Sequence, residues 1–356
     1  MKIPAFSELP VDKNGPHHNA WGLYGPKDEL GTLNRLTDDI VAAAAKEIQT
    51  GTRVSVNWPL DAQLDLPFFG RQAFHKEVYQ KPPRIINDDV WTFNTQSSSQ
   101  WDGLRHFGYQ KEERFYNGVT LDMIHGTNGC TKSDVNGIGA WSEHGIVGRG
   151  ILLDYHAWRI KHDKPHDAFG PSGISASDLL QVAHEQGTEI KFGDILLVRS
   201  GYMDAYSKLK REEIETMRSK QPLTFAGVEQ SDDMMEFLWT NFSAAGGDHP
   251  SWEQWPTQKE YHLHEVMLAG WGMPIGELFD LEKLALQCKK LGRWSFYFMG
   301  IELSGQRKSI LIQTCITSLR NPQQTTVRRI IFHPQCPHSF TTRIHLHKSI
   351  TYVPQH

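Results

Sequence analysis

The chain reads GILLDY at residues 150–155, ISASDLLQVAHEQG at 174–187 and FGDILLVRSG at 192–201. The first and third stretches each hold a short apolar run that ends in polar residues, which is typical of buried strands. The middle stretch predicts a helix, because Ser175 can cap its first turn and Gly187 follows its last turn. Strands and helices therefore mix in this part of the chain.

Two further segments predict helices. Residues 232–242, DDMMEFLWTNF, follow Ser231 and place two aspartates in the first turn, where they favour the helix dipole. Residues 260–270 predict another helix, which carries His264. No repeat or low-complexity tract interrupts these elements, so we expect an α/β (α+β) fold in a single domain over residues 1–302.

The composition changes abruptly after residue 302. Residues 303–356 contain no Asp or Glu and seven Lys or Arg, whereas residues 1–302 have 30 basic and 41 acidic residues, a net charge of −11. We interpret 303–356 as an atypical tail outside the ancestral domain, produced by a shifted reading frame or by non-coding sequence; a basic appendage is the alternative. We expect no packed continuation of the domain there, and an unpaired sheet edge that makes the chain prone to aggregate.

The overall composition narrows the class of protein. A chain of 356 residues with 39% hydrophobic residues can bury a large core. It has no run of eighteen apolar residues and no apolar segment at its start, so we expect a protein outside the membrane. Its four cysteines are scattered, which favours a reducing compartment, so we expect it to be cytoplasmic. The net charge of −4 favours a small-molecule partner over nucleic acid.

A second stretch, QSSSQWDGLRH at residues 96–106, carries candidate chemistry. If it is extended, every second side chain shares one face: Gln96, Ser98, Gln100 and Asp102. Gly103 can turn the backbone and bring His106 to the same side. A carboxylate and an imidazole that face one cavity indicate a metal or acid/base site, whereas Asp-Gly and serine-rich segments are also typical of ordinary loops.

His264 and Glu277 lie thirteen residues apart, too far for one helical face. A helix and the loop after it would have to converge for the two side chains to meet. A lone helical histidine is more often a packed or solvated residue, so this pair alone does not identify a site.

Together, QSSSQWDGLRH and HEVMLAGWGMPIGE (264–277) resemble the cyclase family that includes bacterial kynurenine formamidases and isatin hydrolases. That family has the motif H-x-G-T-H-x-D-x-P-x-H, followed far downstream by a His and a Glu. The stretches at 21–37, 141–155 and 225–230 extend the resemblance, to the fungal-type branch, over about residues 20–300. It implies a swivelling β/β/α fold and assembly as a homo-oligomer.

The resemblance implies that Asp102, His264 and Glu277 bind a divalent metal and that His106 is the acid/base residue. Gln96 and Gln100 stand where the motif has two metal-binding histidines. An amide oxygen is a neutral, hard ligand. Glutamine in place of histidine therefore lowers the affinity for zinc most and favours manganese. We expect manganese or zinc, held with help from the two glutamines; a site with no tight metal is the alternative.

The implied reaction is hydrolysis of an amide-like C–N bond, as in N-formylkynurenine of the kynurenine pathway of tryptophan catabolism, or in a cyclic amide. A bound metal would polarise the carbonyl and activate water, and His106 would carry the proton to the leaving nitrogen. Trp101, Phe107 and Tyr109 are the substrate-binding candidates, with plain core packing as the alternative.

Two rival functions remain. A binding or scaffold protein could keep this fold without the metal, which the two glutamines favour. A metal-free hydrolase could use a serine of 97–99 with His106, although this stretch contains no G-x-S-x-G turn.

Overall fold

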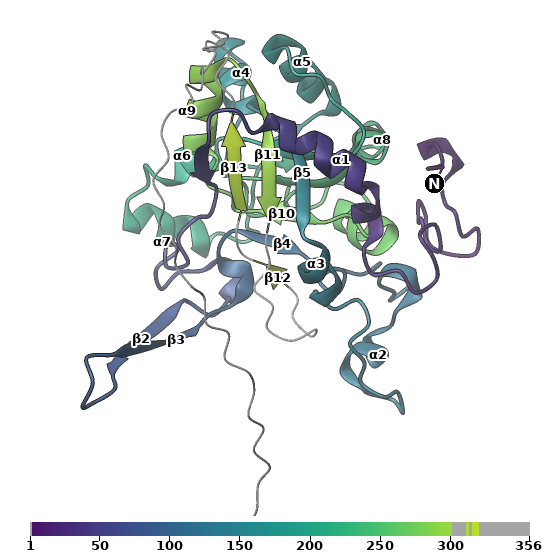
Figure 1. The fold of residues 1–356 in the computed structure, drawn as a ribbon, viewed down its shortest axis with the longest axis horizontal. Helices are drawn as coiled ribbons and strands as arrows, with labels where there is room; N and C mark the ends of the chain where they lie inside the picture. The colour runs from purple at the N-terminus through teal and green to yellow at the C-terminus, as the bar shows by residue number, and fades with distance from the viewer. Residues whose placement is uncertain (1, 301–310, 313–314, 320–356) are drawn as a thin grey trace, which may run out of the picture. The chain divides into compact units, whose positions relative to one another are not determined.

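The fold is built on a mixed β-sheet (Figure 1). The computed structural model describes residues 2–300, 311–312 and 315–319, which all lie within the unit Met1–Pro322. The strands follow the order β1 (Thr52–Ser55), β13 (Cys315–Leu319), β11 (Ser295–Gly300), β5 (Ile146–Leu153), β7 (Asp194–Val198), β9 (Phe242–Gly247), β10 (Ile275–Glu277), β4 (Gln100–Asp102) and β12 (Leu311–Ile312). The neighbours from β5 to β10 are parallel and the other pairs are antiparallel.

The two strands predicted from apolar runs, β5 and β7, lie at the centre of the sheet, so that prediction is confirmed. Their side chains alternate between two hydrophobic cores. Ile151 and Leu153 contribute to one core, whereas Leu152 contributes to the other. Both faces of the sheet are therefore covered, and this explains why the strands read as unbroken apolar runs.

The helices predicted at 174–187 and 232–242 are also confirmed. Helix α5 (Ala176–Gln186) begins after Ser175, whose hydroxyl accepts a hydrogen bond from the backbone N–H of Asp178 at 3.1 Å. Helix α8 (Asp232–Asn241) begins in the same way after Ser231. Both helices pack on the core that contains Ile151.

The helix predicted over residues 260–270 differs from the prediction. Helical backbone starts only at Leu263 and then widens into a π-helix, Glu265–Trp271. The Glu265 carboxylate accepts a hydrogen bond from the backbone N–H of His262, which helps to fix this late start. The π-helix ends at Gly272, where φ is +65°.

The remaining elements are short and lie around the sheet. The α-helices are α1 (Asp38–Ala44), α2 (Leu121–His125), α3 (Gly139–His144), α4 (Tyr155–Lys161), α6 (Tyr202–Tyr206), α7 (Arg211–Ser219) and α9 (Glu282–Leu291). The 3₁₀ helices are Phe6–Glu8, Gly31–Arg35, Ala45–Glu47, Phe68–Gly70, Thr95–Ser97 and Tyr116–Gly118. Strands β6 (Gly173–Ile174) and β8 (Gly227–Val228) form a separate parallel pair.

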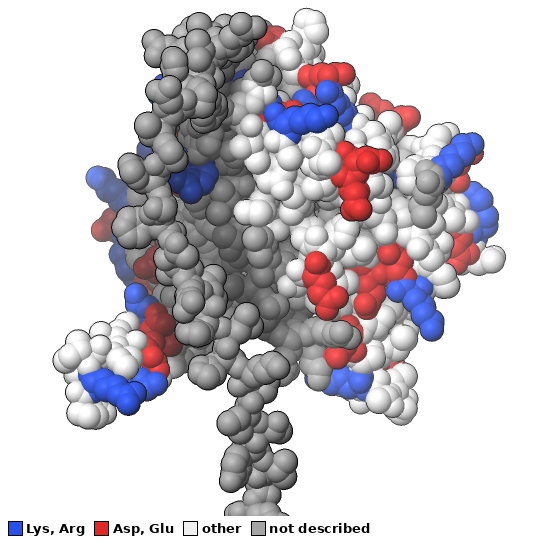
Figure 2. All heavy atoms as spheres, viewed as in Figure 1, with Lys and Arg blue, Asp and Glu red and all other residues white. Residues whose placement is uncertain are grey.

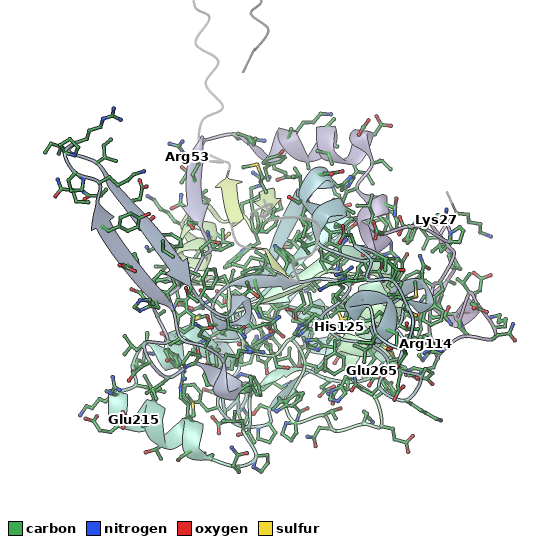
Figure 3. All side chains as sticks on the ribbon, turned by 90° about the horizontal axis from the view of Figure 1, so that it is seen from below. Lys27, Arg53, Arg114, His125, Glu215 and Glu265 are labelled. Carbon is green, nitrogen blue, oxygen red and sulfur yellow. The ribbon has the colours of Figure 1, made fainter. Side chains whose placement is uncertain are left out.

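A hairpin of β2 (His75–Gln80) and β3 (Asn87–Thr92) extends away from the sheet (Figures 1 and 3). Nearly all of its strand residues are exposed, and it carries apolar side chains such as Val78, Val90 and Trp91. The segment that carries the hairpin begins just after Arg71 and ends just before Gln96.

The predicted domain boundary at residue 302 does not coincide with the end of the sheet. Strand β13 lies between β1 and β11, and β12 pairs with β4. The expectation that nothing after Glu302 continues the domain is therefore corrected for 311–312 and 315–319. The rest of the predicted tail lies outside the described residues.

The surface bears charges of both signs. On the face drawn in Figure 2, basic and acidic side chains are interspersed over the described surface. Among the described residues, no helix has the length and apolar character needed to cross a membrane.

We predict that Gly31→Ala destabilises the fold more than Gly51→Ala. Both glycines have positive φ, so both variants carry a similar backbone cost. A Cβ at Gly31, however, would lie 2.1 Å from the carbonyl oxygen of Gly272, whereas a Cβ at Gly51 would meet nothing within 4 Å. Urea unfolding should show an additional loss of about 1–3 kcal/mol for Gly31→Ala, and equal losses would contradict this close contact.

Candidate metal centre

Pairing between β4 and β10 brings the first site residues together. Glu277 lies opposite Gln100, and Ile275 lies opposite Asp102. Because side chains alternate along a strand, Gln100 and Asp102 share a face. The Gln100 amide donates a hydrogen bond to Glu277 Oε2 at 2.9 Å. Asp102 and Glu277 are both buried, at 0% and 3% exposure.

His264, next to the start of the π-helix, points its ring at these carboxylates. Its Nε2 lies 3.5 Å from Asp102 Oδ2 and 3.3 Å from Glu277 Oε1. His106 Nε2 lies 3.7 Å from the same Asp102 oxygen. The structure thus brings together Asp102, His106, His264 and Glu277 from three separate parts of the chain.

Ligand atoms of Asp102, His106 and His264 all lie within 4.8 Å of one another, which makes these three residues the candidate metal group. The sequence-based interpretation separated His106 from the ligands, whereas the geometry includes it in the group. His106 is therefore near enough both to contact a cation and to exchange protons beside it.

The donor set fits a divalent cation. Asp102 Oδ2 is buried and accepts no hydrogen bond from the described residues. Its imidazole neighbours lie 3.5 and 3.7 Å away. Ligands held about 2.0–2.2 Å from a tetrahedral ion lie about 3.4 Å apart, so this spacing is close to that of a metal-ligand set.

The charges of the site also favour a cation. Burial would lower the pKa of His264, but Glu253, Asp102 and Glu277 raise it well above the usual value. Burial would raise the pKa of Asp102, but His106, His264 and Gln96 lower it. Burial and the nearby Asp102 raise the pKa of Glu277. The negative charge of these carboxylates therefore favours a cation in the space between their side chains.

Gln96 and Gln100 reach the site differently from the prediction. Residues 95–97 form a 3₁₀ turn, and Ser98 donates a hydrogen bond to the Trp58 carbonyl, so the predicted continuous strand face is wrong before residue 100. The Gln96 amide nitrogen donates to Asp102 Oδ1 at 2.6 Å and lies 3.1 Å from His106 Nδ1. Gln100 Oε1 accepts no hydrogen bond among the described residues.

Two residues of the site were not found from the sequence. Glu253 is buried, and its Oε2 lies 3.0 Å from His264 Nδ1, a carboxylate–histidine arrangement that orients a ligand ring. Arg71 donates a hydrogen bond to the Gln96 carbonyl at 2.8 Å. Neither residue lies in a motif or at a diagnostic spacing, so a single sequence offered no signal for them.

The three aromatic candidates have different environments. Phe107 lines a cavity of about 230 Å³ together with His106, His264 and Glu277. Trp101 has no exposed surface and packs against Phe279 and Phe298 in the core. The Tyr109 hydroxyl donates to the His17 carbonyl, and its ring packs in the other core. The structure therefore brings only Phe107 of the three to this cavity.

We predict that Glu253→Gln weakens metal binding by about 10- to 100-fold, because it removes the charge that orients the His264 ring. Glu265→Gln is the matched control, since within the described part of the chain the Glu265 carboxylate accepts from the backbone N–H groups of Gln110 and His262 and from no side chain. Competition with a chelator measures both affinities. An equal effect of the two substitutions would mean that Glu253 has no special role.

Comparison with known proteins identifies the family of the chain and structures that share its fold. The family described as "Putative cyclase" matches residues 47–254. No curated protein matches the chain. The crystal structure of a novel cyclase aligns at a TM-score of 0.73 with 25% identity, covering 84% of this chain and 99% of that one.

Two isatin hydrolase structures share the fold at lower similarity. Isatin hydrolase A from Labrenzia aggregata aligns at a TM-score of 0.51 with 14% identity, over 82% of this chain and 100% of that one. An isatin hydrolase bound to the product analogue thioisatinate aligns at a TM-score of 0.52 with 10% identity. The alignment covers 78% of this chain and 94% of that one. Because the family match covers more than half of the sequence, the chain belongs to this cyclase family.

Proposed function

We propose that the protein is a metal-dependent hydrolase of amide-like C–N bonds, acting on an N-formyl aryl amine such as N-formylkynurenine or on a cyclic amide. Manganese or zinc is the proposed metal. Family membership and the fold shared with isatin hydrolases support the reaction class. Assignment to the fungal-type branch and to the swivelling β/β/α arrangement is part of the same proposal.

One observation carries the proposal: Asp102 Oδ2, which is buried and accepts no hydrogen bond from any described residue, lies near the Nε2 atoms of two histidines. Asp102 and His264 would hold the cation, with Glu277 beside them. A divalent cation at such a site polarises a carbonyl and lowers the pKa of water. The adjoining cavity of about 230 Å³ gives the substrate access to these groups.

His106 is placed to move protons in this reaction. Burial lowers the pKa of His106, so its ring is mostly neutral near pH 7. The Gln96 amide nitrogen lies 3.1 Å from Nδ1, and Nε2 is the ring atom that faces Asp102 at 3.7 Å. In hydrolysis the water oxygen joins the carbonyl carbon, the C–N bond breaks, and His106 transfers a proton from the water to the leaving nitrogen.

A second candidate function is a metal-free binding protein. The glutamine amides support it, because Gln96 donates to Asp102 and Gln100 donates to Glu277, so each carboxylate already has a partner. Such a protein would neither bind a cation tightly nor hydrolyse an amide, so metal content and turnover distinguish the two functions.

We also propose that the chain forms a homo-oligomer. The apolar side chains of the β2–β3 hairpin support this, because an isolated two-stranded hairpin is only marginally stable in water. Sedimentation of the full chain purely as a monomer at micromolar concentration would contradict it.

We predict that His106→Ala lowers hydrolysis of N-formylkynurenine or isatin by about 10²- to 10⁴-fold with the metal retained. His125→Ala is the control, since His125 is exposed on α2 (Figure 3). Steady-state kinetics and metal content should be measured on both variants. Unchanged activity in His106→Ala would remove its proposed role, and loss of the metal would make it a ligand.

A further inference from the structure

The cavity beside the metal centre has an arginine in its wall. Arg71 lines this space of about 230 Å³ together with His106, His264 and Glu277. It directly follows the 3₁₀ helix Phe68–Gly70, so it comes from a different part of the chain than the other three residues. The proton transfer assigned to His106 makes no use of this positive charge.

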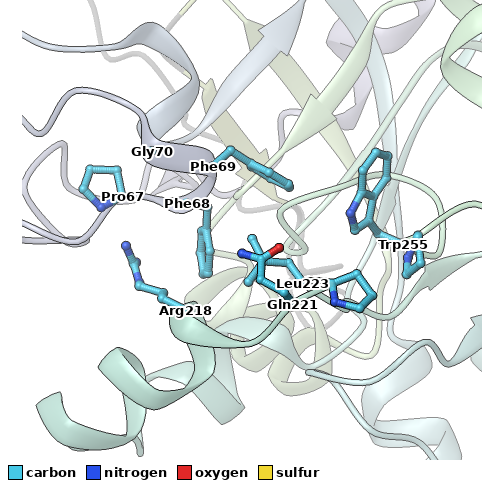
Figure 4. Close-up of a pocket in the computed structure, with 10 residues that line it drawn as sticks. Pro67, Phe68, Phe69, Gly70, Arg218, Gln221, Leu223 and Trp255 are labelled. Carbon is cyan, nitrogen blue, oxygen red and sulfur yellow. The ribbon is translucent and has the colours of Figure 1, made fainter.

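Two contacts hold the Arg71 guanidinium in place. Nη1 donates to the Gln96 carbonyl at 2.8 Å, and the guanidinium carbon lies 4.9 Å from the centre of the Phe69 ring, where a cation is attracted. Phe69 has φ of +59°, which residues with a side chain rarely adopt, and its ring meets that of Trp255 edge to face at 6.0 Å (Figure 4). The guanidinium is therefore oriented before any ligand binds.

Gln96 anchors both Arg71 and His106. Its carbonyl accepts the hydrogen bond from Arg71, and its side-chain amide nitrogen lies 3.1 Å from His106 Nδ1. Gln96 is itself buried, and its backbone N–H donates to the Asn94 side chain at 2.8 Å. Because one fixed residue contacts both groups, the guanidinium and the imidazole keep a constant spacing along the wall of the cavity.

The guanidinium retains donors for a ligand. Glu277 and Asp102 attract its positive charge, but neither forms an ion pair with it within the described part of the chain. Their oxygens have other donors: Gln96 for Asp102 Oδ1, and Gln100 and the backbone N–H of Trp252 for Glu277. Nε and Nη2 of Arg71 make no hydrogen bond to any described residue.

The charges around Arg71 favour one kind of ligand group. A carboxylate near Arg71 would also meet the negative charge of Glu277 and Asp102, whereas a neutral carbonyl oxygen would not. A carbonyl oxygen that gains negative charge only during a reaction benefits from a guanidinium that is already oriented. Arg71 therefore suits the carbonyl of an amide under attack.

We propose that Arg71 is a catalytic residue that donates a hydrogen bond to the carbonyl oxygen of the amide. When the water oxygen joins the carbonyl carbon, the C=O electron pair moves to that oxygen, and the guanidinium stabilises its negative charge. When the C–N bond breaks, the pair returns to the carbonyl, and the nitrogen leaves with the proton that His106 took from the water. This inference rests on the proposed hydrolase function and adds a residue to it.

Kinetics of Arg71→Ala with formanilide, a neutral N-formyl aryl amine, test the inference. We expect kcat to fall by about 10²- to 10³-fold, the effect of losing one donor to an oxyanion, with KM and metal content nearly unchanged. Arg211→Gln is the control, because it removes a guanidinium from the exposed side of α7, beside Asp65 and Glu215. This control should keep the activity of the unmodified chain.

Chemical rescue distinguishes a catalytic role from a structural one. Guanidinium chloride, below the concentration that unfolds the chain, should restore part of the kcat of Arg71→Ala. Urea has the same planar shape without the charge and should restore none of it. Neither compound should restore His106→Ala, which lacks the proton carrier instead.

Calorimetry adds a measurement that needs no turnover. Phenylphosphinate is a tetrahedral anion that mimics the oxyanion, and benzamide is its neutral, planar counterpart. We expect Arg71→Ala to weaken binding of phenylphosphinate by about 10- to 100-fold, the effect of one charge-assisted hydrogen bond, and binding of benzamide far less. Arg211→Gln should bind both compounds like the unmodified chain.

The outcomes separate this inference from the hydrolase function. If formanilide is hydrolysed and Arg71→Ala keeps its kcat, the role of Arg71 is overturned and the hydrolase function stands. Lost activity without rescue, with phenylphosphinate bound as before, also overturns it. If the unmodified chain hydrolyses no amide, the hydrolase function fails, and Arg71-dependent binding of phenylphosphinate still supports the oxyanion site, whereas equal binding overturns it. If Arg71→Ala does not fold, Arg71→Gln, which keeps a donor for the Gln96 carbonyl, takes its place in each comparison.

Discussion

Burying the carboxylate of Asp102, which has no exposed surface, costs free energy unless positive charge faces it. The rest of the site follows from this constraint. One oxygen accepts a hydrogen bond from Gln96, and the other faces the Nε2 atoms of His106 and His264. Burial would lower the pKa of His264, but three carboxylates raise it well above its usual value, so positive charge is favoured beside Asp102.

The sheet explains how such a cluster can be assembled from distant segments. Strands β4 and β10 pair directly, which places Asp102 opposite Ile275 at the start of β10 and Gln100 opposite Glu277 at its end. The π-helix lies between β9 and β10 in the chain and begins beside His264, while Glu253 approaches the far side of the same ring. The geometry groups Asp102, His106 and His264 as a candidate metal site, beside which two glutamines donate their amides to the carboxylates.

Much of the central fold could be predicted from the sequence, because the signals there are local. The apolar runs of β5 and β7 and the capping serines of α5 and α8 depend only on neighbouring residues. The meeting of Asp102, His264 and Glu277 was implied by the family resemblance. The π-helix, the 3₁₀ turn at 95–97 and the role of Glu253 depend on tertiary contacts, which no local pattern encodes. The core position of Trp101 could not be predicted either, because an aromatic residue beside a site can pack in the core or bind substrate.

The central claim is that this cluster binds one divalent cation, and a direct titration tests it. Manganese and zinc should be titrated calorimetrically into the full chain after removal of bound metal, beside Asp102→Asn, which keeps the shape of the side chain and removes its charge. We predict one cation per chain for the unmodified protein and a loss of binding in Asp102→Asn, with unchanged circular dichroism. No saturable binding to the unmodified protein, or equal binding by the two proteins, would contradict the account.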